Sequence, residues 1–153
     1  DIPTLGNCTS SDGLTSCGVD GRTNTNAILA STCIGTTYAA NGANAYEPSG
    51  CKDFCKKTKW FLPSMRDLIT LYNAKSYVNA SLSLTASSGA TTLTESYYWS
   101  STENSNYGAW ILRMSDGYRP WGNKYLNNYD VRPVLAYLVK NIIKAEPEFL
   151  SSR

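Results

Sequence analysis

The chain of 153 residues contains no histidine, few charged residues and no long hydrophobic run. Without histidine, a Ser-His or Cys-His nucleophile pair is impossible, and a zinc site would have to use thiolates alone. Charged residues make up 17% of the chain and the net charge is +2, so nucleic acid is not expected as a partner. No apolar run approaches the ~20 residues needed to cross a bilayer, which argues against membrane insertion.

Catalytic and metal-binding motifs are missing as well. The chain has no glycine-rich phosphate loop and no pair of CxxC motifs. Glu95 and Glu103 could be neighbours, but paired carboxylates are common and nothing else in the sequence supports hydrolysis. We therefore expect no enzymatic activity, no metal site and no cofactor.

Five cysteines are present, at positions 8, 17, 33, 51 and 55. Disulfides formed in an oxidising compartment are the favoured interpretation, which predicts an extracellular or cell-surface protein. Cys8–Cys17 is the expected first bridge, because the short polar loop between them needs a cross-link. For the second bridge, Cys51 or Cys55 pairs with Cys33, or the two pair with each other. One thiol is then left unpaired, either buried or bonded between chains.

Hydrophobic periodicity predicts two short helices. The stretch 23–33 places Ile28, Leu29 and two further residues on one helical face after an Asn or Thr cap. The stretch 62–75 is the clearer element, because Ser64 and Asp67 form a capping box at its start. Its apolar face consists of Met65, Leu68, Ile69 and Tyr72. Residues 34–50 and 79–96 are expected to be loops.

The period then changes from 3.6 to 2, which predicts a small antiparallel sheet. In the stretch 109–121, three inward residues (Trp110, Leu112, Met114) alternate with three outward ones (Ile111, Arg113, Ser115). Asp116-Gly117 supplies a hairpin turn, and residues 131–139 form a last strand in which Pro133 marks an edge or a bulge. We expect an α+β domain with long loops over residues 1–138 and an extension or linker over 139–153.

An aromatic and amide-rich stretch, residues 104–130, is the first candidate binding surface. It holds five Asn, four Tyr, three Gly, two Ser and two Asp. Tyr offers a large contact area with few torsions to restrict, and Asn, Ser and Gly offer adaptable hydrogen bonding. The alternative is that these are ordinary exposed turn and strand positions. The predicted ligand-binding residues are Asn104, Asn106, Tyr107, Ile111, Arg113, Ser115, Tyr118, Arg119, Trp121, Asn123, Tyr125, Asn127 and Tyr129.

A lysine cluster is the second candidate. Lys52, Lys56, Lys57 and Lys59 lie within eight residues, with only Asp53 to oppose them. A homotrimer would triple this local charge, which suits a sulfated polysaccharide bound by avidity. The alternative is a solvated loop with surplus lysines.

Several landmarks occur in a characteristic order: "WFLPSMRDLITLY", then "YYWSSTE", "AW" and "VRPVLAY". Over residues 20–138 this order resembles the C-terminal domain family of the Legionella collagen-like adhesin, which occurs in bacterial surface and phage proteins. The resemblance implies a C-type-lectin-like fold. Trp60, Trp99 and Trp110 would then fill the core, and Arg132 would be a structural ion-pair partner, for instance of Glu103.

The same fold carries calcium-dependent lectins and formylglycine-generating enzymes, but their motifs are not reproduced here. The sequence closest to the calcium-binding "EPN" or "QPD" motif is "EPS" at residues 47–49. It lies before the main helix, in the wrong region, and no "WND" motif follows it. Cys51 and Cys55 are a poor copy of the reactive pair of the enzymes. The resemblance thus implies a binding domain without catalysis.

The fold is also shared with the variable proteins of diversity-generating retroelements, whose randomised positions are rich in Asn, Tyr, Ser, Asp and Gly. Residues 104–130 resemble such a region, although Trp121 cannot arise from a mutated Asn codon. The sequence therefore predicts a surface-exposed adhesion domain for a receptor protein or glycan on another cell, and the resemblance implies that a retroelement could diversify its surface. The alternatives are a structural subunit of a pilus or stalk, and a glycosaminoglycan-binding adhesin that uses the lysine cluster.

Overall fold

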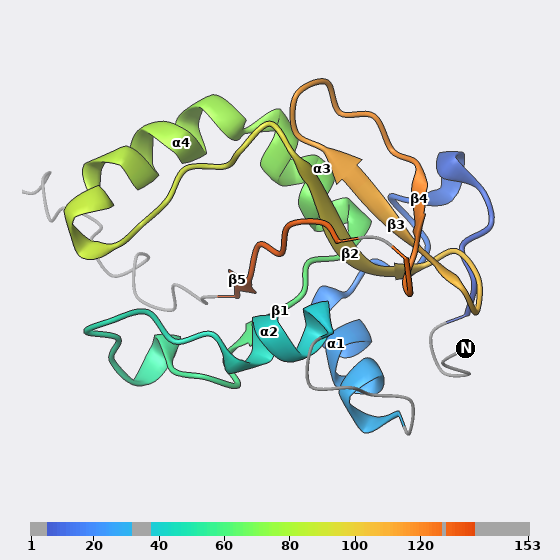
Figure 1. Ribbon diagram of the computed structural model, residues 1–153, viewed down its shortest axis with the longest axis horizontal. Coiled ribbons are helices and arrows are strands. Elements are labelled where there is room, and N and C mark those ends of the chain that lie inside the picture. Colours follow the sequence, from blue (N-terminus) through green and yellow to red (C-terminus); the bar gives the residue numbers. More distant parts are fainter. Residues whose placement is uncertain (1–5, 32–37, 127, 137–153) are drawn as a thin grey trace, which may run out of the picture.

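A computed structural model of the chain describes residues 6–31, 38–126 and 128–136. Helices precede a small sheet along the chain (Figure 1). The α-helices are α1 (Gly21–Ala30), α2 (Ala39–Ala45), α3 (Met65–Asn73) and α4 (Lys75–Leu84). Strands β2 (Tyr97–Glu103), β3 (Gly108–Arg113) and β4 (Trp121–Asn123) form the main sheet, and β1 (Trp60–Phe61) pairs with β5 (Val134–Leu135). Short 3₁₀ turns are η1 (Ser11–Gly13), η2 (Asp53–Cys55) and η3 (Ala86–Ser88).

The predicted α+β class is confirmed, and both predicted helices are present as α1 and α3. Asp20 caps α1 by accepting a hydrogen bond from Thr23 N at 3.0 Å, and this bond lowers the pKa of the Asp20 carboxyl. The predicted capping box of α3 is also present: Ser64 Oγ accepts from Asp67 N at 3.2 Å, and Asp67 Oδ2 accepts from Ser64 N at 2.9 Å.

Two further helices lie in segments that were expected to be loops. Helix α2 has the sequence AANGANA, whose Gly and Asn weaken the helical signal, but Ala40 and Ala43 are buried against the rest of the domain. Helix α4 follows α3 after Ala74 alone and buries no residue. The prediction failed for both because tertiary packing and continuity with α3 outweigh local propensity.

The main sheet is antiparallel in the order β2-β3-β4 and is covered on both faces (Figure 1). One face carries Tyr98, Trp110, Leu112 and Met114 and packs against residues of α3. The other face carries Trp99, Ala109 and Ile111 and packs against α2, with Ile28 and Leu29 of α1 alongside. A strand that is covered by helices on both faces of its sheet buries both of its sets of alternating side chains, so the alternation does not mark a solvent-facing side.

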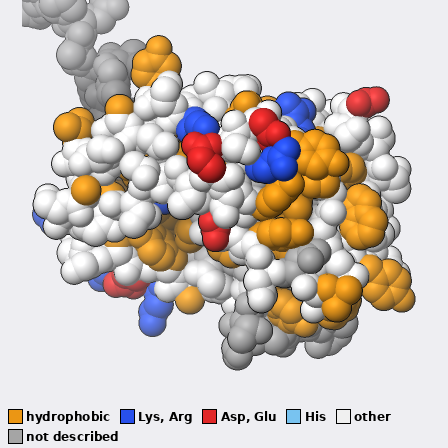
Figure 2. All heavy atoms as spheres, turned by 45° about the horizontal axis from the view of Figure 1, so that its top comes forward, with side chains coloured by type: hydrophobic (Ala, Val, Ile, Leu, Met, Phe, Trp, Pro, Cys, Tyr) orange, Lys and Arg blue, Asp and Glu red, His pale blue; other side chains and the backbone are white. Residues whose placement is uncertain are grey.

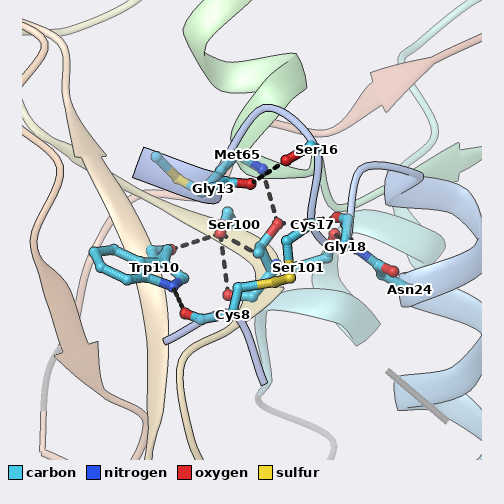
Figure 3. The surroundings of a disulfide bond; sticks show 11 residues. Cys8, Gly13, Ser16, Cys17, Gly18, Asn24, Met65, Ser100, Ser101 and Trp110 are labelled. Carbon is cyan, nitrogen blue, oxygen red and sulfur yellow. Dashed lines mark hydrogen bonds between the residues drawn. A yellow bond between two sulfur atoms is a disulfide. The ribbon is translucent and has the colours of Figure 1, made fainter. Parts of the chain in front are cut away.

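Buried hydroxyls along β2 connect the sheet to the N-terminal segment (Figure 3). Ser100 Oγ donates to Trp110 O at 2.6 Å, and Thr102 Oγ1 donates to Gly18 O at 3.1 Å and accepts from Met65 N at 3.0 Å. The Trp110 Nε1–H donates to Cys8 O at 2.7 Å. These bonds satisfy backbone groups where three segments meet.

Two expectations of the resemblance, a core position for Trp60 and an ion pair between Arg132 and Glu103, need correction. Trp99 and Trp110 are buried as expected, but Trp60 is only half-buried and lies edge-on to Tyr46. Arg132 does not pair with Glu103: its guanidinium donates to Thr91 O at 2.9 Å. The edge strand suggested by Pro133 is β5, which pairs with β1 at Val134 and Leu135.

Two disulfides cross-link the domain. Cys8–Cys17 is confirmed, and the second bridge is Cys51–Cys55, so neither of these two cysteines pairs with Cys33. Cys33 itself lies outside the described residues, as do residues 139–153 of the predicted extension. The domain boundary at residue 138 therefore stays a prediction.

Candidate functional site

The predicted ligand-binding residues differ widely in exposure. Asn106, Tyr107, Ser115, Tyr118, Arg119, Trp121 and Tyr125 are exposed, whereas Asn104, Arg113, Asn123 and Tyr129 are partly buried. The prediction that Ile111 points to solvent is wrong, because its side chain is 1% exposed between the sheet and the α1–α2 layer. Asn127 lies outside the described residues.

Four exposed rings give this region its character. Tyr107, Tyr118, Trp121 and Tyr125 are between 55% and 66% exposed, which is unusual for such large apolar groups. They lie on the β2–β3 turn and on the segment that includes β4, and we call them the aromatic edge. Figure 2 shows hydrophobic side chains gathered on the right-hand part of one face, beside adjacent basic and acidic side chains.

Arg113 organises one end of the aromatic edge. Its guanidinium stacks between the rings of Tyr97 and Tyr118, at 5.4 and 5.3 Å from their centroids, and donates to Tyr97 Oη at 3.0 Å. It also forms an ion pair with Asp116. The side-chain hydrogen bonds of this pair raise the pKa of Arg113 and hold the pKa of Asp116 at about 2. Both groups therefore stay charged at neutral pH.

Lys124 organises the other end. Its Nζ donates to the Glu103 carboxylate, to Ser105 O at 3.2 Å and to Asn106 O at 3.4 Å, and its backbone N donates to Tyr107 O at 2.9 Å. Glu103 is 4% exposed, so this ion pair is largely removed from water. Lys124 thereby fastens the turn after β4 to the β2–β3 turn that carries Tyr107.

The segment between these two ends runs along β3 as the outer strand of the sheet. Trp121 pairs with Trp110 on one face, and Gly108 leaves room for its ring, because a Cβ there would lie 3.0 Å from the indole. On the other face, a Cβ at Gly122 would meet the rings of Tyr129 and Trp99 at 2.8 and 3.0 Å. Tyr129, which is partly buried, therefore packs against the sheet with part of its ring.

The sheet thus divides the expected single patch. Side chains alternate along a strand, so Trp121 shares the Trp110 face whereas Tyr118 lies with Arg113 on the opposite face. The two groups meet only at the outer edge of the sheet, from which both are accessible. The structure therefore assembles the predicted residues along an edge instead of on one continuous face.

Three contributing residues were not among the predicted ones: Tyr97, Glu103 and Lys124. Tyr97 could have been found from its i, i+2 relation to the buried Trp99, which places both on one face of β2. Lys124 is the only lysine between residues 104 and 130, a weak signal of a specific partner. Nothing in the sequence pairs it with Glu103.

The lysine cluster forms a separate site. Lys52, Lys56, Lys57 and Lys59 are all exposed on the segment 51–59, whose first five residues are closed into a loop by the Cys51–Cys55 disulfide. The ammonium of Lys56 lies 3.4 Å from Asp53 in an exposed ion pair. The exposed Phe54 belongs to the same segment, which joins basic and apolar surface.

Two other kinds of feature, metal-binding clusters and membrane-spanning helices, are absent from the described residues. No three or more Cys, Asp or Glu side chains there come together as a metal-binding group. Among the helices described, none has the length and apolar character to span a bilayer.

Comparison with known proteins connects the chain to a family but to no individual protein. Neither a curated protein nor a solved structure matches it significantly, so the C-type-lectin-like fold stays an expectation of the resemblance. The Lcl C-terminal domain family matches residues 11–135, which include the Cys51–Cys55 disulfide, the main sheet and the aromatic edge. The chain belongs to the Lcl C-terminal domain family.

Proposed function

We propose that this chain is a non-enzymatic, surface-exposed binding domain whose aromatic edge contacts a glycan or protein receptor on another cell. Family membership and two disulfides support a location outside the reducing cytosol. The observation that carries the proposal is the exposure of Tyr107, Tyr118, Trp121 and Tyr125.

The supports of these rings strengthen the proposal. The guanidinium of Arg113 packs against the ring of Tyr118, and the absence of a side chain at Gly108 leaves space for the ring of Trp121. Hydrogen bonds from Lys124 connect the turn that carries Tyr107 to the turn that carries Tyr125. Rings held in place before binding lose little conformational entropy when a ligand arrives. Tyr and Trp side chains are also those most often found to dominate binding energy.

The test compares two tyrosine variants on glycan and cell-surface receptor arrays. Replacing Tyr107, Tyr118 and Tyr125 by Ala together is expected to abolish adhesion while the thermal unfolding curve stays close to that of the unchanged protein. Tyr77→Ala is the matched control, because Tyr77 is 82% exposed on α4, outside the aromatic edge. Equal retention by both variants would refute the proposal, and loss of assembly alone would favour a pilus or stalk subunit.

Polyanion binding is the second candidate function, supported by the four exposed lysines of the 52–59 segment. Binding of a sulfated polysaccharide there should weaken steeply with salt, because exposed charges are screened within about 10 Å at 0.1 M. Reversing Lys52, Lys57 and Lys59 to Glu should abolish retention on heparin. Arg66→Glu is the control, since Arg66 is exposed on α3. Unchanged retention after the lysine reversal would exclude this candidate.

Diversification by a retroelement is a further part of the proposal. It is supported by the Asn- and Tyr-rich composition of residues 104–130. A reverse transcriptase gene nearby, with a near-copy of this coding stretch that differs only at adenines, is the expected finding. A gene neighbourhood without either would count against it.

A further inference from the structure

The outer strand of the sheet continues beyond β4. Arg113 N donates to Tyr118 O at 2.9 Å and Ile111 N donates to Pro120 O at 3.0 Å, in the same register that pairs Ala109 with Gly122. Residues 118–123, which we call the edge segment, therefore form one extended ladder along β3. Its even-numbered residues direct their backbone groups toward β3.

The odd-numbered residues direct their backbone groups away from the sheet. In an antiparallel ladder, each residue between two hydrogen-bonded pairs points its N–H and C=O to the opposite side. Within the edge segment these residues are Arg119, Trp121 and Asn123. The carbonyl of Asn123 accepts from Leu126 N at 3.4 Å, whereas no hydrogen bond within the described part of the chain reaches the backbone groups of Arg119 and Trp121. Both residues are exposed, and no strand among the described residues pairs with this side of the edge segment.

Pro120 does not block the open side. Proline often protects an edge because it removes a donor. Here the carbonyl of Pro120 accepts from Ile111, so its missing N–H faces β3 and the outward donors of Arg119 and Trp121 remain. The edge therefore keeps the alternating donors and acceptors that an added strand requires.

The charge of Arg119 on the edge segment indicates which kind of incoming strand would fit. Arg113 is paired with Asp116 and Lys124 with Glu103, whereas the exposed Arg119 has no carboxylate within ion-pair distance among the described residues. An acidic side chain on an incoming strand would supply that partner. A second copy of the chain would instead bring its own Arg119 to the same edge.

We propose that the edge segment binds an extended, acidic peptide of a partner protein by β-strand addition. The inference rests on the proposed binding function and specifies its partner class. The partner's backbone pairs with Arg119 and Trp121, an Asp or Glu side chain meets the Arg119 guanidinium, and the exposed rings of Tyr118 and Trp121 flank the added strand on its two faces.

The probe is an array of eight-residue peptides that alternate Val and Thr and carry one Glu, Gln or Lys at a scanned position. Amide hydrogen exchange of the ¹⁵N-labelled domain is followed with each retained peptide. Glu peptides should be retained best, and the amides of Arg119 and Trp121 should exchange at least about 10-fold more slowly. Arg119→Gln should weaken binding about two- to fivefold, the range of an exposed ion pair.

Backbone pairing is tested separately from charge. Arg119→Pro removes the outward N–H as well as the charge, without touching a bond to β3, so it should weaken binding more than Arg119→Ala. Methylation of peptide nitrogens should abolish binding at the alternate positions that face the edge segment and leave it intact at the others. This second measurement uses the unchanged protein and does not depend on how the variants fold.

The outcomes separate the inference from the proposed function. Retention of Glu peptides with protected Arg119 and Trp121 amides supports the inference. Glycan or receptor binding that leaves those amides unprotected overturns it while the proposed function stands. Retention of no peptide also overturns it, as does a dimer in sedimentation whose Arg119 and Trp121 amides are protected without peptide.

Discussion

The ion pair between Glu103 and Lys124 provides the sharpest test of how the aromatic edge is held. The Glu103 side chain is 4% exposed and that of Lys124 is 23% exposed. Glu103 Oε2 has no hydrogen-bond partner among the described residues, so the ammonium of Lys124 is the main compensation for this buried charge. Lys124→Met removes the ammonium and keeps most of the side-chain volume.

Breaking a buried ion pair from one side typically costs about 3–5 kcal/mol, because the remaining charge is left uncompensated. That is a large part of the 5–15 kcal/mol that stabilises a domain, and it corresponds to a drop in Tm of roughly 10 °C. Removing both charges in Glu103→Gln with Lys124→Met should recover much of the loss, since replacing a whole buried pair is often close to neutral.

The measurement is equilibrium unfolding in urea of the single, double and unchanged proteins at neutral pH. Lys56→Met is the matched control, because Lys56 and Asp53 form an exposed pair that should contribute less than about 1 kcal/mol. If Lys124→Met costs no more than Lys56→Met, the Glu103 carboxylate is solvated and the reasoning fails. A double variant less stable than Lys124→Met would refute it too.

Three further predictions concern the same domain. Gly122→Ala places a Cβ 2.8 Å from an aromatic ring and should destabilise the fold by about 1–3 kcal/mol, whereas an unchanged urea midpoint would show that the rings yield. The pKa of Asp116 is held at about 2 by Arg113, below the ordinary 3.8, so its stabilisation is present above pH 4 and is lost as the pH falls toward 2. The unfolding curves of Asp116→Asn and the unchanged protein should therefore converge over that range, and parallel curves would contradict the assignment. Replacing Cys8 and Cys17 by Ser should cost about 2–3 kcal/mol for a loop of this length, and an equal Tm for both proteins would show that the bridge does not restrict the unfolded chain.

Features that depend on neighbours along the chain were predictable. The capping box of Ser64 and Asp67 starts α3, the period-2 pattern marks β3, and the short polar loop indicates the Cys8–Cys17 bridge. The exposure of Tyr107, Tyr118 and Tyr125 was also predicted, since Tyr among Asn, Ser and Gly is typical of contact surfaces. Each of these signals depends only on residues that are close together in the sequence, so it can be recognised without knowing which distant segments meet.

Features that depend on which distant segments meet were decided by the tertiary structure. Ile111 is buried because α1 and α2 cover the second face of the sheet. The alternation of side chains within β3 does not indicate whether helices pack on one face of the sheet or on both. Glu103 binds Lys124 and not Arg132 because the turn after β4 folds back onto the β2–β3 turn. The candidate surface lies along an edge, with its rings on two faces, because burial and ion pairing are properties of neighbours in space rather than of neighbours in sequence.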